Sequence, residues 1–277
     1  MNGRLSAFLL GAPTMIFIGL LFLLPVGVLV VGSFFSDNHE LSLAVYRDFF
    51  VDGFNRALIL RTVKLSLITT LVSLVLAFPV ALHMRQMSQR WRSIVSLIIL
   101  SPLLTSVVVR TLAWVILLSP RGIVNSALAV AGLDPLALIY NDVGIVIGLT
   151  HVFLGYMALS LMTSLSRIDE NLVLAASNLG ASRWVILREI ILPLSAPGIL
   201  AGSILVFTMS ASSYATPALL GGTSNKVLAT EIYDLAVNEL DFRAAGAVSL
   251  ILLVGVSIIA FGVTYFAEHG RGKEVFR

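Results

Sequence analysis

The chain has 277 residues, of which 58% are hydrophobic and 12% are charged, whereas about 25% of the residues in a soluble domain are charged. This composition excludes an ordinary soluble protein and predicts a polytopic membrane protein. The net charge of +3 comes without a block of like charges, so we expect no nucleic acid partner. Because there is no cysteine, disulfides, thiol catalysis and thiolate metal sites are excluded.

Six apolar runs are long enough to cross a bilayer, whose hydrocarbon core takes about 20 apolar residues per helix. They cover residues 9–33, 62–83, 94–118, 144–165, 196–218 and 244–267. The predicted fold is therefore all-α, with six transmembrane helices. The first run is about twice as long as the apolar region of a signal peptide and no A-x-A site follows it, so we expect it to be retained as a span.

The basic residues of the short connections predict the orientation. The loop from Arg85 to Arg92 holds three arginines and no acid, so we place it inside. Counting spans from this loop puts both termini in the cytoplasm, with ten basic residues inside and seven outside, while ten of the fifteen acids fall outside. The inside set includes the terminal residues Arg4, Arg271, Lys273 and Arg277.

Arg110 lies in the middle of the third run, where an arginine on a lone helix costs about 2.5–3.5 kcal/mol. It therefore needs partners. Two interpretations remain open: bonds to helix ends or carbonyls inside the bundle, or a place on the translocation path.

Between the fourth and fifth runs, residues 175–193 read AASNLGASRWVILREIILP, which is too polar for hydrocarbon. Residues 171–179 favour a helix, and Gly180 can adopt the positive φ that ends one. Ser182 can cap a second helix, which Pro193 should stop. Each helix has an apolar face, formed by Leu172, Ala175, Ala176 and Leu179 in the first and by Trp184, Leu187, Ile190 and Ile191 in the second. We expect a helix, turn and helix at the cytoplasmic surface with the apolar side on the bundle; an interfacial helix without a further role is the alternative.

The fifth run ends in a polar cluster just before Pro217, a residue that frees backbone acceptors and can kink the span. Such polar residues either line a pathway or pack helices closely. Tyr214 is the candidate to face a solute, because an amine can sit over its ring. The candidate pathway residues of the whole chain are Arg110, Trp114, Tyr156, Ser212, Ser213, Tyr214 and Thr216.

Ala175-Ala176, three residues, Gly180, nine residues and then Ile190-Ile191-Leu192-Pro193 resemble the cytoplasmic EAA loop of ATP-binding-cassette (ABC) importer permeases. The family pattern begins with glutamate, where this chain has Leu174. In that family the loop, here about residues 166–195, docks on the ATPase as a coupling helix. The resemblance implies that the coupling residues are Ala175, Ala176, Gly180, Ala181, Ser182, Arg183 and Pro193.

Further segments are similar to the first of the two unlike permeases of spermidine/putrescine-type importers. They are residues 102–114 (PLLTSVVVRTLAW), 122–125 (GIVN), 138–141 (LIYN) and 216–222 (TPALLGG). Ser213 and Ala218 stand where acidic residues are common in polyamine members. Losing two carboxylates weakens the case for a polycation, so a polyamine and a zwitterionic or amino-acid-like amine both remain open as the solute.

The chain itself is not expected to be an enzyme. It has no G-x-x-x-x-G-K-[ST] phosphate loop and no H-E-x-x-H motif, so we predict no catalytic residue, no metal and no cofactor bound by this chain. The rival function is an ion-gradient-driven secondary transporter. Such proteins usually carry acids within their spans, whereas the acids here fall outside the six runs or near their ends, which favours energy supplied by another subunit.

The resemblance implies the type I importer permease fold, with a single transmembrane domain over residues 1–277 and a core of about 58–267. It also implies a bacterial cytoplasmic (inner) membrane location and a small organic amine as the cargo. The implied partners are a second, similar permease in a heterodimer, two copies of an ATP-binding subunit that holds ATP and Mg, a periplasmic solute-binding protein, and membrane lipid.

Overall fold

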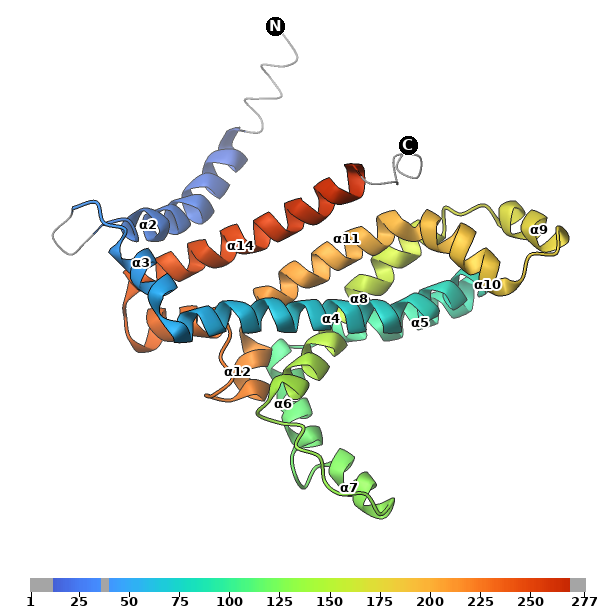
Figure 1. The fold of residues 1–277 in the computed structure, drawn as a ribbon, viewed down its shortest axis with the longest axis horizontal. Helices are drawn as coiled ribbons and strands as arrows, with labels where there is room; N and C mark the ends of the chain where they lie inside the picture. Colours follow the sequence, from blue (N-terminus) through green and yellow to red (C-terminus); the bar gives the residue numbers. More distant parts are fainter. Residues whose placement is uncertain (1–11, 36–39, 270–277) are drawn as a thin grey trace, which may run out of the picture. The chain divides into compact units, whose positions relative to one another are not determined.

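The computed structural model describes residues 12–35 and 40–269. In this part of the chain the elements are helices, apart from one isolated bridge between Phe35 and Leu41 (Figure 1). Six stretches are long and apolar enough to cross a membrane: Ala12–Gly32, Gly53–Gln86, Val107–Val130, Asp142–Leu165, Arg183–Ala211 and Phe242–Phe266. The all-helical class and the number of spans predicted from the sequence are confirmed. The terminal basic residues of the orientation count lie outside the described residues: Arg4, Arg271, Lys273 and Arg277.

The helices follow one another with short connections. In chain order they are η1 (Gly19–Leu23), α2 (Leu24–Gly32), α3 (Ala44–Val51), α4 (Gly53–Gln86), α5 (Gln89–Leu100), η2 (Ser101–Leu104), α6 (Val107–Leu118), α7 (Ile123–Val130), α8 (Asp142–Leu165), α9 (Glu170–Asn178), α10 (Arg183–Ile186), η3 (Leu187–Ile191), α11 (Leu192–Ala211), α12 (Ala215–Gly221), α13 (Leu228–Tyr233), η4 (Asp234–Asn238) and α14 (Phe242–His269). The chain divides into two compact units, residues 1–57 with 231–253 and residues 58–230 with 254–277. The single-domain boundaries expected from the sequence stay a prediction.

In the first unit, α3 is fastened to the end of α2 by an aromatic residue. The hydroxyls of Tyr46 and Ser33 are 2.6 Å apart, and the Tyr46 ring stacks on Phe34 with a centroid distance of 5.2 Å. These two contacts hold α3 against the residues that follow the first span.

The second unit is built around α8, half of whose apolar window is buried, against a third or less for the other spans. Helix α11 packs antiparallel on α8 through small residues: a Cβ added at Gly198 would lie 2.6 Å from the Cβ of Ser164, and one at Gly202 would lie 3.0 Å from that of Ser160. Small residues let two helix backbones approach closely, which is the usual basis of helix packing in membranes.

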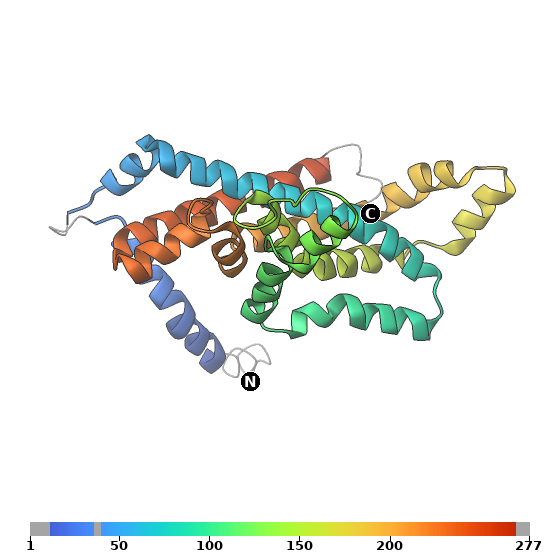
Figure 2. The ribbon, with the colours of Figure 1, turned by 90° about the horizontal axis from the view of Figure 1, so that it is seen from below.

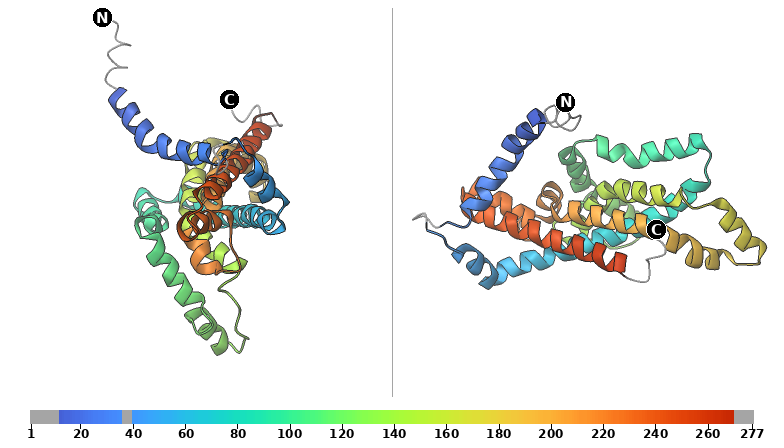
Figure 3. Two further views of the ribbon diagram at one scale, coloured as in Figure 1. Left: turned by 90° about the vertical axis from the view of Figure 1, so that its left-hand side faces the viewer. Right: turned by 90° about the horizontal axis from the view of Figure 1, so that it is seen from above.

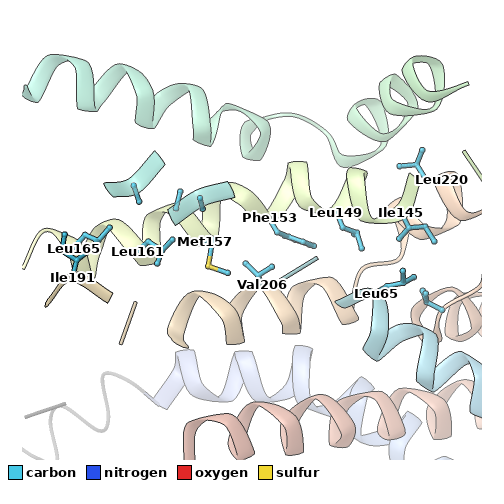
Figure 4. Close-up of a cluster of buried hydrophobic side chains, with 14 of the residues drawn as sticks. Leu65, Ile145, Leu149, Phe153, Met157, Leu161, Leu165, Ile191, Val206 and Leu220 are labelled. Atoms are coloured by element: carbon cyan, nitrogen blue, oxygen red, sulfur yellow. The ribbon is translucent and has the colours of Figure 1, made fainter. Parts of the chain in front are cut away.

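Buried side chains at intervals of four residues run the length of α8 (Figure 4). Leu65 of α4, Val206 of α11 and Leu220 of α12 pack into the same cluster. The row on α8 consists of Ile145, Leu149, Phe153, Met157, Leu161 and Leu165. Three further helices thus share one hydrophobic core with α8, and this core carries the loop and the polar residues described below.

Two of the predicted spans are broken. The run at 94–118 is two helices, because α5 ends at Leu100 and the 3-10 turn η2, which contains Pro102, leads to a new helix at Val107. Proline lacks the N–H that would continue the α-helical ladder. The backbone then leaves the helical region at Thr105 and Ser106, whose ψ angles are 150° and 132°. Figure 2 shows α5 turning a corner into α6 at this point.

The run at 196–218 breaks before its proline and not at it. Helix α11 ends at Ala211, and α12 begins at Ala215. Pro217 lies in the first turn of α12, where a missing N–H has no intrahelical partner to lose. The kink expected at Pro217 is therefore a helix break at residues 212–214.

Candidate functional site

Helices α9 and α10 form a hairpin beyond the ends of α8 and α11 (Figure 3). Asp169 caps α9 by accepting a hydrogen bond from the backbone N–H of Asn171 (2.9 Å). Ser182 caps α10 by accepting from the N–H of Val185 (3.4 Å). The two helices and the cap predicted from the sequence are confirmed.

The turn between these helices depends on Gly180, whose φ is +84°. The N–H of Ala181 donates to the carbonyl of Ala176, and the N–H of Gly180 donates to that of Ser177, both at 3.0 Å. This pair of bonds is the Schellman motif, which ends a helix with a residue in the left-handed region. The predicted role of Gly180 as the helix stop is confirmed.

Pro193 does not stop the second helix, contrary to the prediction. Ahead of it the chain forms the π turn η3, in which the N–H of Leu192 donates to the carbonyl of Leu187. This wider turn accommodates the missing proline N–H, so α10, η3 and α11 run as one helical stretch from Arg183 to Ala211. The loop is thereby joined to the fifth span without a flexible link.

The apolar side of the hairpin is largely exposed. On the predicted inward face of the first helix, Leu172 and Ala175 are exposed, and Leu179, which follows α9, is 89% exposed. Trp184 of α10 is 69% exposed. Of the second helix, Ile186 and Ile191 are the residues buried toward the bundle. The prediction that the hairpin packs its apolar faces on the bundle is therefore wrong for the exposed residues. It is confirmed for Ala176, Leu187 and Ile191, which pack in or against the hydrophobic core, and Ile190 is half-buried.

The other residues predicted to couple to an ATPase lie along the same hairpin. Ala175 and Arg183 are exposed, whereas Ala176, Ala181 and Pro193 are half-buried. At its base the hairpin is tied to α4, because Nη2 of Arg85 donates to the carbonyl of Ile168 at 2.9 Å.

Arg110 is only 8% exposed and donates from Nη1 to the carbonyl of Pro102, at the break between α5 and α6. Its Nε has no hydrogen-bond partner among the described residues. A bundle carbonyl thus supplies one of the partners that a buried arginine needs. A place for Arg110 on the pathway stays a prediction.

Two polar contacts join α6 to its neighbours. The indole Nε1–H of Trp114 donates to Nδ1 of His151 on α8 (3.2 Å), and their rings meet edge to face. The hydroxyls of Thr111 and Thr216 are 3.4 Å apart, and Thr216 is 1% exposed. Thr216, on α12, therefore packs against α6 in this unit.

The other candidate pathway residues are more accessible. Ser212, Ser213 and Tyr214 occupy the break between α11 and α12, where Ser212 is exposed and Tyr214 is 37% exposed. Tyr156 is half-buried on α8, with its ring 6.3 Å from that of Phe153. Trp114 and Thr216 thus contact partners on neighbouring helices. Residues 212–214 form the non-helical connection between α11 and α12.

His151 and Asp142 were not predicted from the sequence to pair with residues of other helices. His151 lies inside the fourth predicted run, and a titratable residue within a span is a functional candidate by default; that signal was available. Asp142, at the start of α8, is 3.0 Å from Nζ of Lys64 and 3.6 Å from Nε of Arg61. No sequence spacing indicates this pairing, because it joins residues of two different spans.

Comparisons with known proteins agree with this geometry. No family model matches the chain. The spermidine/putrescine transport system permease protein PotB of Escherichia coli (strain K12) is 27% identical over 252 residues, 87% of this chain and 91% of that protein. The inner membrane ABC transporter permease protein YdcU of the same strain is 32% identical over 200 residues, 67% of this chain and 64% of that protein.

Solved structures show the same fold. A bacterial ABC transporter involved in the import of the acidic polysaccharide alginate matches with a TM-score of 0.82 at 22% identity, over 97% of this chain and 96% of that chain. The MetNI methionine ABC transporter in an inward-facing conformation matches with a TM-score of 0.56 at 18% identity, over 82% of this chain and 100% of that chain.

Six apolar helices, the hairpin between the fourth and fifth spans and these matches make the chain similar to the multi-pass permeases of ABC importers. Among these it resembles the spermidine/putrescine type, since PotB matches over most of its length.

Proposed function

We propose that this permease moves a small organic amine across the bacterial cytoplasmic membrane, driven by a separate ATPase that docks on the α9 and α10 hairpin. The observation that carries the proposal is the hairpin itself. It exposes apolar side chains, Leu179 and Trp184 foremost, and it continues into the fifth span without a break. Exposed apolar patches of this kind mark protein interfaces.

In this proposal, the continuous helix transmits the movement of a docked ATPase to the transport path. A displacement of α10 would be carried along α11 to residues 212–214, where the span opens. Two copies of the ATPase, holding ATP and Mg, would act on this chain and on a second, similar permease. A periplasmic solute-binding protein would deliver the solute, and both termini would lie in the cytoplasm.

The proposed solute class is supported by one relative and by two side chains. PotB is named as a spermidine/putrescine permease, which favours an amine. Ser213 and Ala218 leave the end of the fifth span without carboxylates, and a polycation gains most from carboxylates in a low-dielectric path. A polyamine and a zwitterionic, amino-acid-like amine are therefore both within the proposal.

A cysteine-labelling experiment tests the docking. The chain has no cysteine, so Leu179→Cys provides one exposed thiol on the hairpin. We expect the purified ATPase subunit to protect this thiol from a polar maleimide. The matched control is Val130→Cys, because Val130 is 92% exposed on α7, and its labelling should not change when the ATPase is added. Equal labelling of Leu179→Cys with and without the ATPase would refute the docking site.

A further inference from the structure

A cavity of about 280 Å³ lies at the base of the hairpin. It is formed where α4 and α8 end and α5 and α9 begin, all within the second unit. Its size is near the lower limit of ligand pockets, about 300 Å³, so it suits a head group or a small anion. Its lining includes Ala81, Arg85, Arg92, Leu165, Ser166 and Glu170.

The charge in this cavity is mainly positive. Arg85 and Arg92 both line it, and neither lies within 4 Å of a carboxylate among the described residues. Glu170 is the single acid in the lining, and it is exposed at the first turn of α9. Two guanidinium groups against one carboxylate leave a net positive site.

Both arginines are held in place by backbone carbonyls and keep free donors. Arg92 donates from Nε to Met84 (3.2 Å) and from Nη2 to the carbonyl of Arg85 (2.9 Å), while Arg85 donates from Nη2 to Ile168 (2.9 Å). No bond of either Nη1 group occurs within the described part of the chain. Carbonyls fix the guanidinium planes but do not neutralise their charge, so the free N–H groups remain available to an anion.

We propose that this cavity binds a phosphate group, from an anionic lipid head group or from a soluble organic phosphate. Guanidinium groups match phosphate oxygens with paired hydrogen bonds, and basic pockets between membrane helices bind lipid head groups. The apolar wall of Ala81 and Leu165 suits the glyceride side of a lipid. The proposal rests on the proposed function in one respect only: the orientation given there places the cavity in the cytoplasmic leaflet.

The site would act on the hairpin through Arg85. This side chain links the end of α4 to Ile168, two residues before α9 begins. A phosphate bound between Arg85 and Arg92 would hold both guanidinium groups, and with them the joint between the bundle and the hairpin.

The test measures the unfolding midpoint of the full chain in detergent as phosphatidylglycerol, phosphatidylcholine with the same acyl chains, or glycerol phosphate is added. A ligand that binds the folded state raises the midpoint in a saturable way. We expect phosphatidylglycerol to raise it more than phosphatidylcholine. If glycerol phosphate reproduces the shift, the ligand is a soluble phosphate; if the lipid alone produces it, the ligand is a head group.

Three variants assign the shift to the cavity. Arg85→Gln should weaken the apparent affinity by about tenfold, because a charged hydrogen-bond donor is lost. Arg90→Gln is the matched control, since Arg90 is exposed in the first turn of α5 and does not line the cavity. Ser166→Leu keeps both arginines but fills part of the cavity, so it should also reduce the shift, and it decides the matter if Arg85→Gln does not fold.

The absence of a saturable shift in the unmodified chain would overturn the proposal. Equal shifts in Arg85→Gln, Ser166→Leu and Arg90→Gln would overturn it as well, because the phosphate would then bind elsewhere. The measurement uses neither transport nor the ATPase, so its failure is separate from a failure of the proposed function.

Discussion

At Gly180 the backbone has a φ of +84°, and a Cβ built there would meet nothing within 4 Å. The positive φ, and not a lack of space for a side chain, therefore limits which residues can replace this glycine. The left-handed region costs an ordinary L-residue about 1–2 kcal/mol, and asparagine tolerates it better than most. Substitutions at this position can thus separate the geometry of the turn from the bulk of the side chain.

We expect Gly180→Val to disrupt the turn and to reduce the amount of ATPase that co-purifies with the permease. Valine is β-branched, which makes a positive φ especially unfavourable. Gly180→Asn should retain most of the binding, although its side chain is of similar size. Membrane abundance, measured by immunoblot, should be similar for both. Full co-purification with the valine variant would show that docking does not depend on this turn.

At the scale of elements, a helix can be predicted from the sequence when one physical requirement fixes its length or its ends. The six spans follow from the thickness of hydrocarbon, and the ends of α9 and α10 follow from Gly180 and Ser182. Prolines were less predictable, because their effect depends on what surrounds them. Pro102 lies in the 3-10 turn between α5 and α6, and the π turn η3 before Pro193 lets the helix continue through it. Pro217 lies in the first turn of α12, where it breaks no helical hydrogen bond.

The periodicity of the sequence also does not predict the contact between α8 and α11. This contact can be tested by measuring how a substitution in it changes the stability of the folded chain. We expect Gly198→Ala to lower the unfolding midpoint in detergent, because the new Cβ would lie 2.7 Å from the carbonyl oxygen of Ser160, which belongs to backbone and cannot turn aside. Overpacking of this kind typically costs about 1–3 kcal/mol.

Gly255→Ala is the matched control for this prediction. Gly255 lies within α14, and a Cβ there would meet nothing within 4 Å. Alanine should be neutral or stabilising at this position, since it favours helix over glycine by up to about 1 kcal/mol. An equal loss of stability in both variants would mean that close packing of α8 on α11 is not what Gly198 provides.

For the whole molecule, the sequence predicted where the hairpin lies better than it predicted which faces of its helices are buried. The EAA-like spacing located the hairpin, but the apolar side of its helices was assigned to the bundle, while Leu179 and Trp184 are exposed. Periodicity identifies an apolar face without saying what covers it. The contact of Trp114 with His151 was missed for a related reason, because it joins two helices whose relative rotation no pattern within one helix determines.

The source of energy is the property that separates an importer subunit from a secondary transporter. Within the described spans the carboxylates are Asp142 and Glu189, and both lie near helix ends beside basic residues. Neither is placed in mid-span, where ion-coupled transporters use acids. His151 is the residue that keeps a proton-driven rival worth testing, because it is titratable and lies within α8.

We expect the purified chain in liposomes to carry neither radiolabelled putrescine nor a zwitterionic amino acid when a pH or sodium gradient is applied. Transport should appear only when a second permease, the ATPase with ATP and Mg, and the solute-binding protein are present. The control is the same liposomes containing His151→Gln, which keeps a hydrogen-bond acceptor for Trp114 and removes the titratable ring. Flux through the isolated chain that follows the pH gradient and is lost in His151→Gln would establish the secondary transporter, because a proton would then be the coupling ion and His151 its binding site.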